Sequence, residues 1–70
     1  MPFIDITIGE GRSPDTIREL IAELHDATRR ALGVPGESIR ICVRETPLTH
    51  YAAGGRTIAE RRAAEQPPGK

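Results

Sequence analysis

The sequence predicts an α/β (α+β) fold in which a short βαβ unit with parallel strands is followed by a C-terminal β-hairpin. Two segments, residues 3–8 and 38–45, have apolar side chains at every second position, and residues 14–32 between them have apolar side chains at three- and four-residue spacing. The pair Gly54-Gly55 marks a tight turn further along the chain. One helix covers only one face of a two-stranded sheet, so a symmetric oligomer is expected to complete the fold.

The first strand is expected at residues 3–8, because strict alternation is typical of a strand with one apolar face. Gly9 and Gly11 then interrupt the pattern. The apolar face carries Ile4, Ile6 and Ile8, and the opposite face carries Phe3, Asp5 and Thr7.

A helix is expected to begin at Pro14, directly after Ser13. Serine is a favoured N-cap, proline fits the first helical position, and Asp15 adds an acidic side chain to the first turn. Gly33 ends the helix. The apolar stripe contains Ile17, Leu20, Ile21, Leu24, Thr28, Ala31 and Leu32, and charged side chains fill the outer surface.

The second strand, at residues 38–45, is expected to lie parallel to the first. A helix of 19 residues, 14–32, spans about 28 Å, which is enough to return the chain beside its first strand with a right-handed crossover. Asp5 and Arg44 would then share the face opposite the helix, where we expect them to pair in a structural or interface role. One face of this strand carries Ile39, Ile41 and Val43, and the other carries Arg40, Cys42 and Arg44.

The end of the chain is expected to form a short hairpin at residues 50–58 and then a mobile tail. The segment from Ala59 shows no core pattern and closes in Gln-Pro-Pro-Gly-Lys. We therefore expect one domain at residues 2–62 and a mobile tail at 63–70.

Composition excludes several classes of protein. Ten Lys plus Arg balance ten Asp plus Glu, so the basic surplus of a nucleic-acid-binding protein is absent. No apolar run is long enough for a membrane span, and a cytoplasmic protein is expected. The single cysteine, Cys42, cannot form an internal disulfide, and with the two histidines it lacks the spacing of a zinc site. A 70-residue chain with only 14 Ile, Leu or Val residues buries little surface alone, so self-association is expected.

Pro2 is the first candidate catalytic residue. It follows the initiator Met1, and a small second residue normally leads to removal of that methionine. The new terminus would be a secondary amine, and burial or neighbouring cations would lower its pKa toward neutrality, so that it could act as a base.

The surroundings of Pro2 resemble the 4-oxalocrotonate tautomerase family in order and spacing. The resemblance covers residues 2–62, and the ordered set on a βαβ frame is more specific than any single element. The residues that carry it are Pro2 at the head of a strand, Gly11-Arg12-Ser13 before the helix, Arg40 in the second strand, and then Glu45, His50, Tyr51 and Gly54-Gly55.

The resemblance implies a cofactor-free isomerase that converts a 2-hydroxydienoate, such as 2-hydroxymuconate, to its conjugated 2-oxo acid. Pro2 would be the general base and then the general acid. Arg40 would bind the 1-carboxylate and the 2-oxygen, Arg12 would bind the far carboxylate of a diacid, and Tyr51 would form an apolar wall. Such enzymes assemble as hexamers, trimers of dimers, with sites built from more than one subunit, so a homohexamer is expected.

Two positions depart from the namesake of the family. Gly9 stands where the namesake has a bulky apolar residue, which predicts a wider pocket, and Tyr51 replaces a phenylalanine. Arg62 lies near a basic residue at the namesake's terminus and would reach the rim of the site. Two alternatives remain: a hydratase or dehalogenase of a small unsaturated acid that uses Pro2 with Glu45 or Tyr51 to activate water, and a non-catalytic oligomerisation module.

Overall fold

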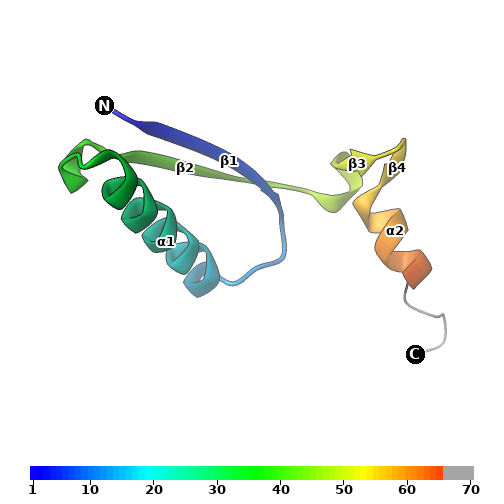
Figure 1. Ribbon diagram of the computed structural model, residues 1–70. Helices are drawn as coiled ribbons and strands as arrows, with labels where there is room; N and C mark the ends of the chain where they lie inside the picture. The colour runs from blue at the N-terminus through cyan, green and yellow to red at the C-terminus, as the bar shows by residue number, and fades with distance from the viewer. Residues whose placement is uncertain (66–70) are drawn as a thin grey trace.

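A computed structural model describes residues 1–65 of the chain. Strand β1 (Phe3–Gly9) leads into helix α1 (Pro14–Leu32), and the chain returns through strand β2 (Arg40–Thr46). A short hairpin of β3 (Ala52–Ala53) and β4 (Arg56–Thr57) follows, and helix α2 (Ile58–Glu65) ends the described part. Single 3₁₀ turns precede β2 (Gly36–Ser38) and β3 (Leu48–His50). The predicted fold class is confirmed (Figure 1).

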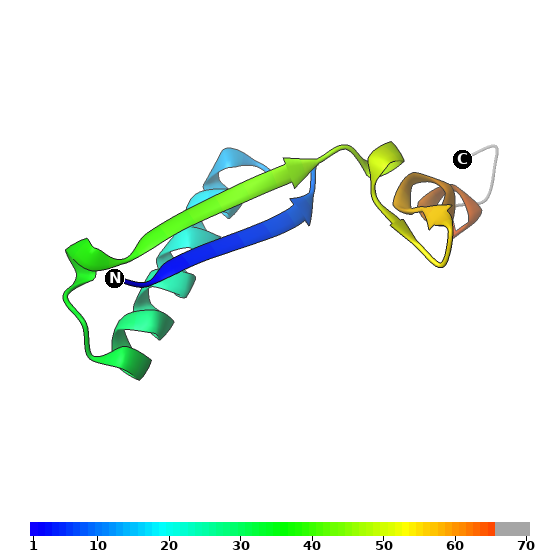
Figure 2. The ribbon, with the colours of Figure 1, turned by 90° about the horizontal axis from the view of Figure 1, so that it is seen from above.

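The two long strands pair in parallel, from Phe3 opposite Arg40 to Gly9 opposite Thr46. Helix α1 lies along one face of this sheet, and the other face carries no element of the described chain (Figures 1 and 2). The side chains of Ile4, Ile6 and Ile8 are half-buried, whereas their neighbours Phe3, Asp5 and Thr7 are exposed. The predicted division of the first strand into two faces is therefore correct.

Strand β2 begins at Arg40, later than the predicted start at residue 38. Residues 36–38 form a 3₁₀ turn, in which the Ser38 N–H donates to the Pro35 carbonyl at 3.1 Å and the Ile39 N–H donates to the Gly36 carbonyl at 3.2 Å. These local bonds occupy backbone groups that a longer strand would have used for pairing.

Both ends of α1 are capped as the sequence predicts. The Ser13 hydroxyl accepts a hydrogen bond from the Thr16 N–H at 3.2 Å, and Pro14 occupies the first turn. At the other end Gly33 adopts the left-handed conformation (φ 66°) and its N–H donates to the Arg29 carbonyl at 2.9 Å. No helix within residues 1–65 is long and apolar enough to cross a membrane.

From Ala59 the sequence analysis expects a mobile tail without a core pattern, and it does not predict a helix there. Residues 58–65 form α2, which begins with a reciprocal capping box: the Thr57 N–H donates to the Glu60 carboxylate at 2.9 Å and the Glu60 N–H donates to the Thr57 hydroxyl at 3.0 Å. This signature, Thr-x-x-Glu, is visible in the sequence. The rest of the predicted tail, residues 66–70, lies outside the described residues.

The described chain contains very little core. Ile39 is its only buried large apolar residue, with 8% of its surface exposed, whereas Phe3 is 66% exposed. The hairpin and α2 extend away from the βαβ unit, so the chain is elongated, at 51 × 25 × 16 Å (Figure 1). A single copy leaves most of its apolar residues in contact with water.

One ion pair joins the strands on the face opposite α1. Arg44 donates from Nε and Nη2 to the two carboxylate oxygens of Asp5, both at 2.9 Å, in a bidentate arrangement. The predicted pairing of these residues is confirmed. Hydrogen bonding by Arg44 lowers the pKa of the Asp5 carboxyl from its ordinary value of 3.8, and hydrogen bonding by Asp5 raises the pKa of Arg44.

Because the folded state lowers the pKa of Asp5, the contribution of this carboxylate to stability is complete above pH 3.8 and is lost as the pH falls through the lower, folded value. We expect Asp5→Asn to remove that part of the acid dependence of unfolding. Urea unfolding at pH 7 and pH 3 measures the effect. Glu19→Gln, on the exposed surface of α1, is the control, and an identical acid response of Asp5→Asn and wild type would contradict this prediction.

Candidate active site

Pro2 and Arg40 lie together where the two parallel strands begin. The Arg40 N–H donates to the Pro2 carbonyl at 3.0 Å, as the first bond of the ladder. Pro2 is half-buried, while Met1 before it is 84% exposed and open to removal. The Arg40 side chain is exposed and donates from Nη1 to the Glu37 carbonyl at 2.7 Å. The carbonyl is neutral and Arg40 is in no ion pair within residues 1–65, so its charge remains available to an anion.

Arg12 and Tyr51 lie together at the opposite end of β1. A pocket of about 330 Å³ is formed there by the end of β1, the turn before the hairpin and helix α2. Arg12 donates from Nη1 to the Gly9 carbonyl, a long hydrogen bond of 3.3 Å. Within residues 1–65, Arg12 has no acidic partner. The pocket is lined by Thr7, Ile8, Gly9, Arg12, Leu48, Tyr51, Ile58 and Arg62.

The four predicted site residues therefore form two pairs, not one cluster. Strand β1 separates the pairs, and its seven residues at about 3.3 Å each extend over roughly 23 Å. Pro2 and Arg40 of one copy cannot meet Arg12 and Tyr51 of the same copy across that length. A site that uses all four residues has to combine two copies of the chain.

The prediction of a wider pocket at Gly9 is corrected by the structure. A Cβ atom built on Gly9 would lie 2.7 Å from Cδ2 of Leu48, so the leucine already occupies the space that a side chain at this position would take. Leu48 and Ile58 were not among the predicted site residues. Both are single apolar residues in short turns and caps, where periodicity carries no signal.

Of three further candidate residues, Arg62, Glu45 and His50, only Arg62 lies in this pocket. Arg62 lines the pocket with Arg12, as the resemblance implied. Glu45 is exposed on β2 and His50 is exposed at the end of the 3₁₀ turn, and neither lines this pocket. None of the described residues that line the pocket beside Tyr51 thus supplies a carboxylate to activate water.

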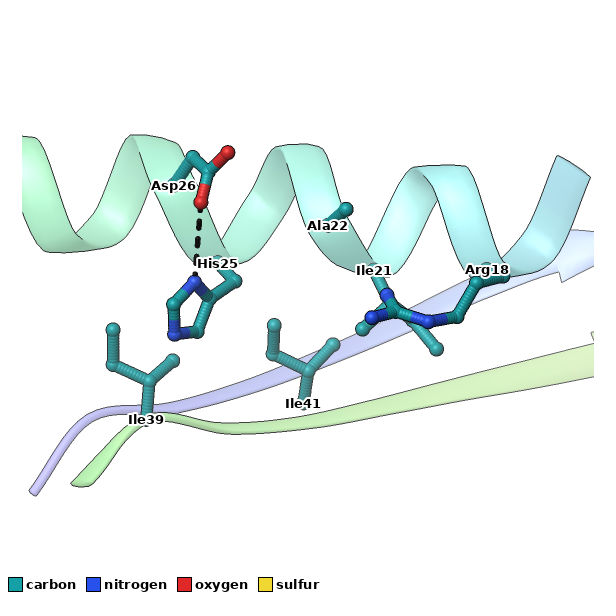
Figure 3. Close-up of a pocket in the computed structure, with 7 residues that line it drawn as sticks. All are labelled: Arg18, Ile21, Ala22, His25, Asp26, Ile39 and Ile41. Atoms are coloured by element: carbon teal, nitrogen blue, oxygen red, sulfur yellow. Dashed lines mark hydrogen bonds and ion pairs between the residues drawn. The ribbon is translucent and has the colours of Figure 1, made fainter. Parts of the chain in front are cut away.

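A second, larger cavity of about 520 Å³ lies between α1 and β2 (Figure 3). The His25 ring points from the helix toward Ile39, and its Nδ1 lies 3.2 Å from a carboxylate oxygen of Asp26. None of the predicted site residues lines this cavity. No group of three or more His, Cys, Asp or Glu within the described residues is arranged to hold a metal ion.

Comparison with known proteins identifies the family. A family model described as tautomerase enzyme matches residues 2–61. The chain belongs to the tautomerase family. It is 40% identical over 55 residues to a 2-hydroxymuconate tautomerase of Stutzerimonas stutzeri, a match that covers 79% of this chain and 87% of the relative. It is 37% identical over 68 residues to a probable tautomerase of Ralstonia nicotianae, with 97% and 93% of the two chains covered.

Solved structures of tautomerases share the fold. TomN, a 4-oxalocrotonate tautomerase homologue in the tomaymycin biosynthetic pathway, superposes with a TM-score of 0.89 and 43% identity over 93% of this chain and all of that one. One chain of a heterohexameric 4-oxalocrotonate tautomerase from Chloroflexus aurantiacus superposes with a TM-score of 0.82 and 38% identity over 86% and 97% of the two chains. The resemblance to the 4-oxalocrotonate tautomerase family is confirmed, and this tautomerase is an isomerase.

Proposed function

We propose that this tautomerase converts a 2-hydroxydienoate, of which 2-hydroxymuconate is the model, to its conjugated 2-oxo acid without a cofactor. The observation that carries the proposal is the position of a half-buried Pro2 beside Arg40 at the start of the two strands, where the Arg40 backbone N–H donates to the Pro2 carbonyl. The similarity to 2-hydroxymuconate tautomerases of Stutzerimonas stutzeri and Pseudomonas putida, at 40% and 38% identity, supports the substrate class.

Pro2 is the proton carrier in this proposal. After removal of Met1, its secondary amine accepts the proton of the 2-hydroxyl group, and the O–H electron pair forms the carbonyl while the double bonds shift along the chain. The ammonium then returns the proton to a distant carbon as a new C–H bond, so that no electrons are gained or lost. A positioned base of this kind works best when its pKa lies near the working pH, and a guanidinium that binds the same substrate beside the amine would disfavour the ammonium form.

Arg40 is the electrostatic partner of the amine. Its guanidinium has five N–H donors in a planar fork, and the Glu37 carbonyl uses only one nitrogen, Nη1. The remaining donors are suited to the 1-carboxylate and the 2-oxygen of the substrate. Negative charge develops on that oxygen as the proton leaves, so the contacts strengthen in the transition state.

The complete site requires self-association, and we propose a homohexamer built as a trimer of dimers. The separation of the two residue pairs by β1, the uncovered sheet face and the sparse core all favour a shared site. In such a site the Arg12 and Tyr51 pocket of one copy receives the far end of a substrate whose reacting end lies at Pro2 of another copy.

Removal of Met1 is the first test of the proline mechanism, because Pro2 can act as a base only with a free amine. We expect intact mass spectrometry of the active protein to show a chain that begins at Pro2. A homogeneous preparation that retains Met1 and is fully active would contradict the mechanism.

Mixing two impaired variants tests whether the site is shared. Pro2→Ala is expected to lower kcat on the order of 100-fold, and Arg12→Ala is expected to impair turnover of the diacid. When the two are unfolded, mixed in equal amounts and refolded, about a quarter of the sites combine an intact Pro2 with an intact Arg12, because these residues come from different copies. Activity with 2-hydroxymuconate should therefore rise well above the sum of the separate variants.

The control for this experiment mixes Pro2→Ala with the double variant Pro2→Ala/Arg12→Ala, which yields no intact proline and should show no gain. Light scattering on each mixture establishes that oligomers have formed. If the mixture of single variants gains nothing although oligomers form, Pro2 and Arg12 serve the same chain's site or separate functions, and the shared site is wrong.

Substrates with one and two carboxylates distinguish the two arginines. Arg40→Ala should lower kcat for every substrate, since Arg40 contacts the reacting end. Arg12→Ala should lower kcat/KM for 2-hydroxymuconate by roughly 10- to 150-fold, which is the loss of a charge-assisted hydrogen bond of about 1.5–3 kcal/mol, and leave a monoacid enol nearly unchanged. Equal losses on diacid and monoacid would show that Arg12 does not read the far carboxylate.

A further inference from the structure

Gly9 lacks a side chain for a steric reason and not because of its backbone conformation. The glycines with positive φ in the described residues are Gly11, Gly33, Gly54 and Gly55, so Gly9 has a backbone that any L-residue could adopt. A Cβ atom on Gly9 would nevertheless lie 2.7 Å from Cδ2 of Leu48, closer than carbon atoms can approach, and 3.9 Å from Cδ2 of Tyr51. A side chain at this position would therefore require the flexible Leu48 side chain to move.

Leu48 has two contacts that matter for the site. One side of its isobutyl group covers Gly9, and the residue also lines the pocket that holds Arg12 and Tyr51. Leu48 begins the 3₁₀ turn Leu48–His50, which is held by the His50 N–H donating to the Pro47 carbonyl at 2.8 Å. The leucine is thus presented by a hydrogen-bonded turn that follows directly on β2, whose last residue, Thr46, accepts a hydrogen bond from the Glu10 N–H at 2.9 Å.

The chemistry of the pocket divides into an apolar and a charged part. Ile8, Leu48 and Ile58 are aliphatic, while Arg12 and Arg62 contribute two guanidinium groups with no acidic partner within residues 1–65. The guanidinium groups select charge, as proposed above for Arg12 and the far carboxylate of a diacid. The aliphatic side chains can select only size and shape, since they offer no hydrogen bonds.

We propose that Leu48 is a specificity-determining residue, which limits the size of the substrate end that enters this pocket. The inference rests on the proposed function, because it assigns the pocket to the part of an unsaturated 2-hydroxy acid that is remote from Pro2. Leu48 fills the space above Gly9, so the pocket accepts a slim, unbranched dienoate chain and excludes a bulky aromatic substituent. The two positions are coupled, because the Leu48 side chain occupies the space that a side chain on Gly9 would take.

Two substitutions should change the pocket in opposite directions. Leu48→Ala removes the isobutyl group and opens the space above Gly9. Gly9→Ala places a methyl group where Leu48 now lies, and because the leucine side chain is flexible it has to rotate away from β1, into the pocket that it lines. In the double variant Gly9→Ala/Leu48→Ala the new methyl group enters the vacated space, so the pocket should return toward its original size.

The experiment measures kcat/KM for two monoacid enols, 2-hydroxy-2,4-pentadienoate and the bulkier phenylenolpyruvate. Neither has a second carboxylate, so the contribution of Arg12 is held constant. Leu48→Ala should raise the ratio of phenylenolpyruvate to pentadienoate by about tenfold or more, and Gly9→Ala should lower it by about tenfold. The double variant should lie between them. Thr49→Ala, an exposed neighbour in the same turn, is the matched control and should leave the ratio unchanged.

Circular dichroism and light scattering on each variant establish folding and assembly, and Leu48→Val replaces Leu48→Ala if the alanine variant does not fold. A ratio within about twofold of wild type in both the Leu48 and the Gly9 variants would overturn the inference. If wild type converts neither these enols nor 2-hydroxymuconate, the proposed function has failed. Calorimetric binding of pyruvate and phenylpyruvate to the same variants then decides the size rule separately, with an unchanged affinity ratio again overturning it.

Discussion

The parallel register of β1 and β2 is the constraint on which the rest of the structure depends. Phe3 lies opposite Arg40, and the Arg40 N–H bonds to the Pro2 carbonyl, so the same ladder that forms the sheet also brings Arg40 and Pro2 to one end of it. A slip of one residue would turn Arg40 toward the helix and expose Ile39 and Ile41 to water. The half-buried apolar face beneath α1 therefore enforces the geometry of the site, although none of its side chains takes part in chemistry.

Much of this arrangement is readable from the sequence, because it follows from local rules. Alternation identifies the two strands and their faces, and Ser13 and Gly33 mark the ends of α1. The same alternation places Asp5 and Arg44 on one face of the sheet, which predicts their pairing. The separation of the site residues into two ends was implicit in the length of β1, since a strand of seven residues holds its termini far apart. Helix α2 was not predicted, because it is short and its apolar stripe is weak. The capping box of Thr57 and Glu60 is the sequence signal that indicates it.

The pocket around Gly9 could not be predicted in the same way. A glycine in place of a bulky residue suggests empty space when the chain is read position by position. The structure shows that a residue 39 positions later, Leu48, occupies that space. Such compensation depends on how a turn packs against a distant strand, and neither propensity nor periodicity encodes that contact. Differences between related pockets are therefore better judged from packed volumes than from single substitutions.

The bond between the Arg40 N–H and the Pro2 carbonyl also bears on how the protein can be handled. It anchors the chain immediately after the ring nitrogen, so any residue in front of Pro2 is attached directly to the nitrogen that we propose as the base. An affinity tag or fusion partner at this terminus would convert the amine to an amide, which has no basic lone pair. The far end, beyond α2, is the place to attach reporters, surfaces or purification handles to an enzyme of this design.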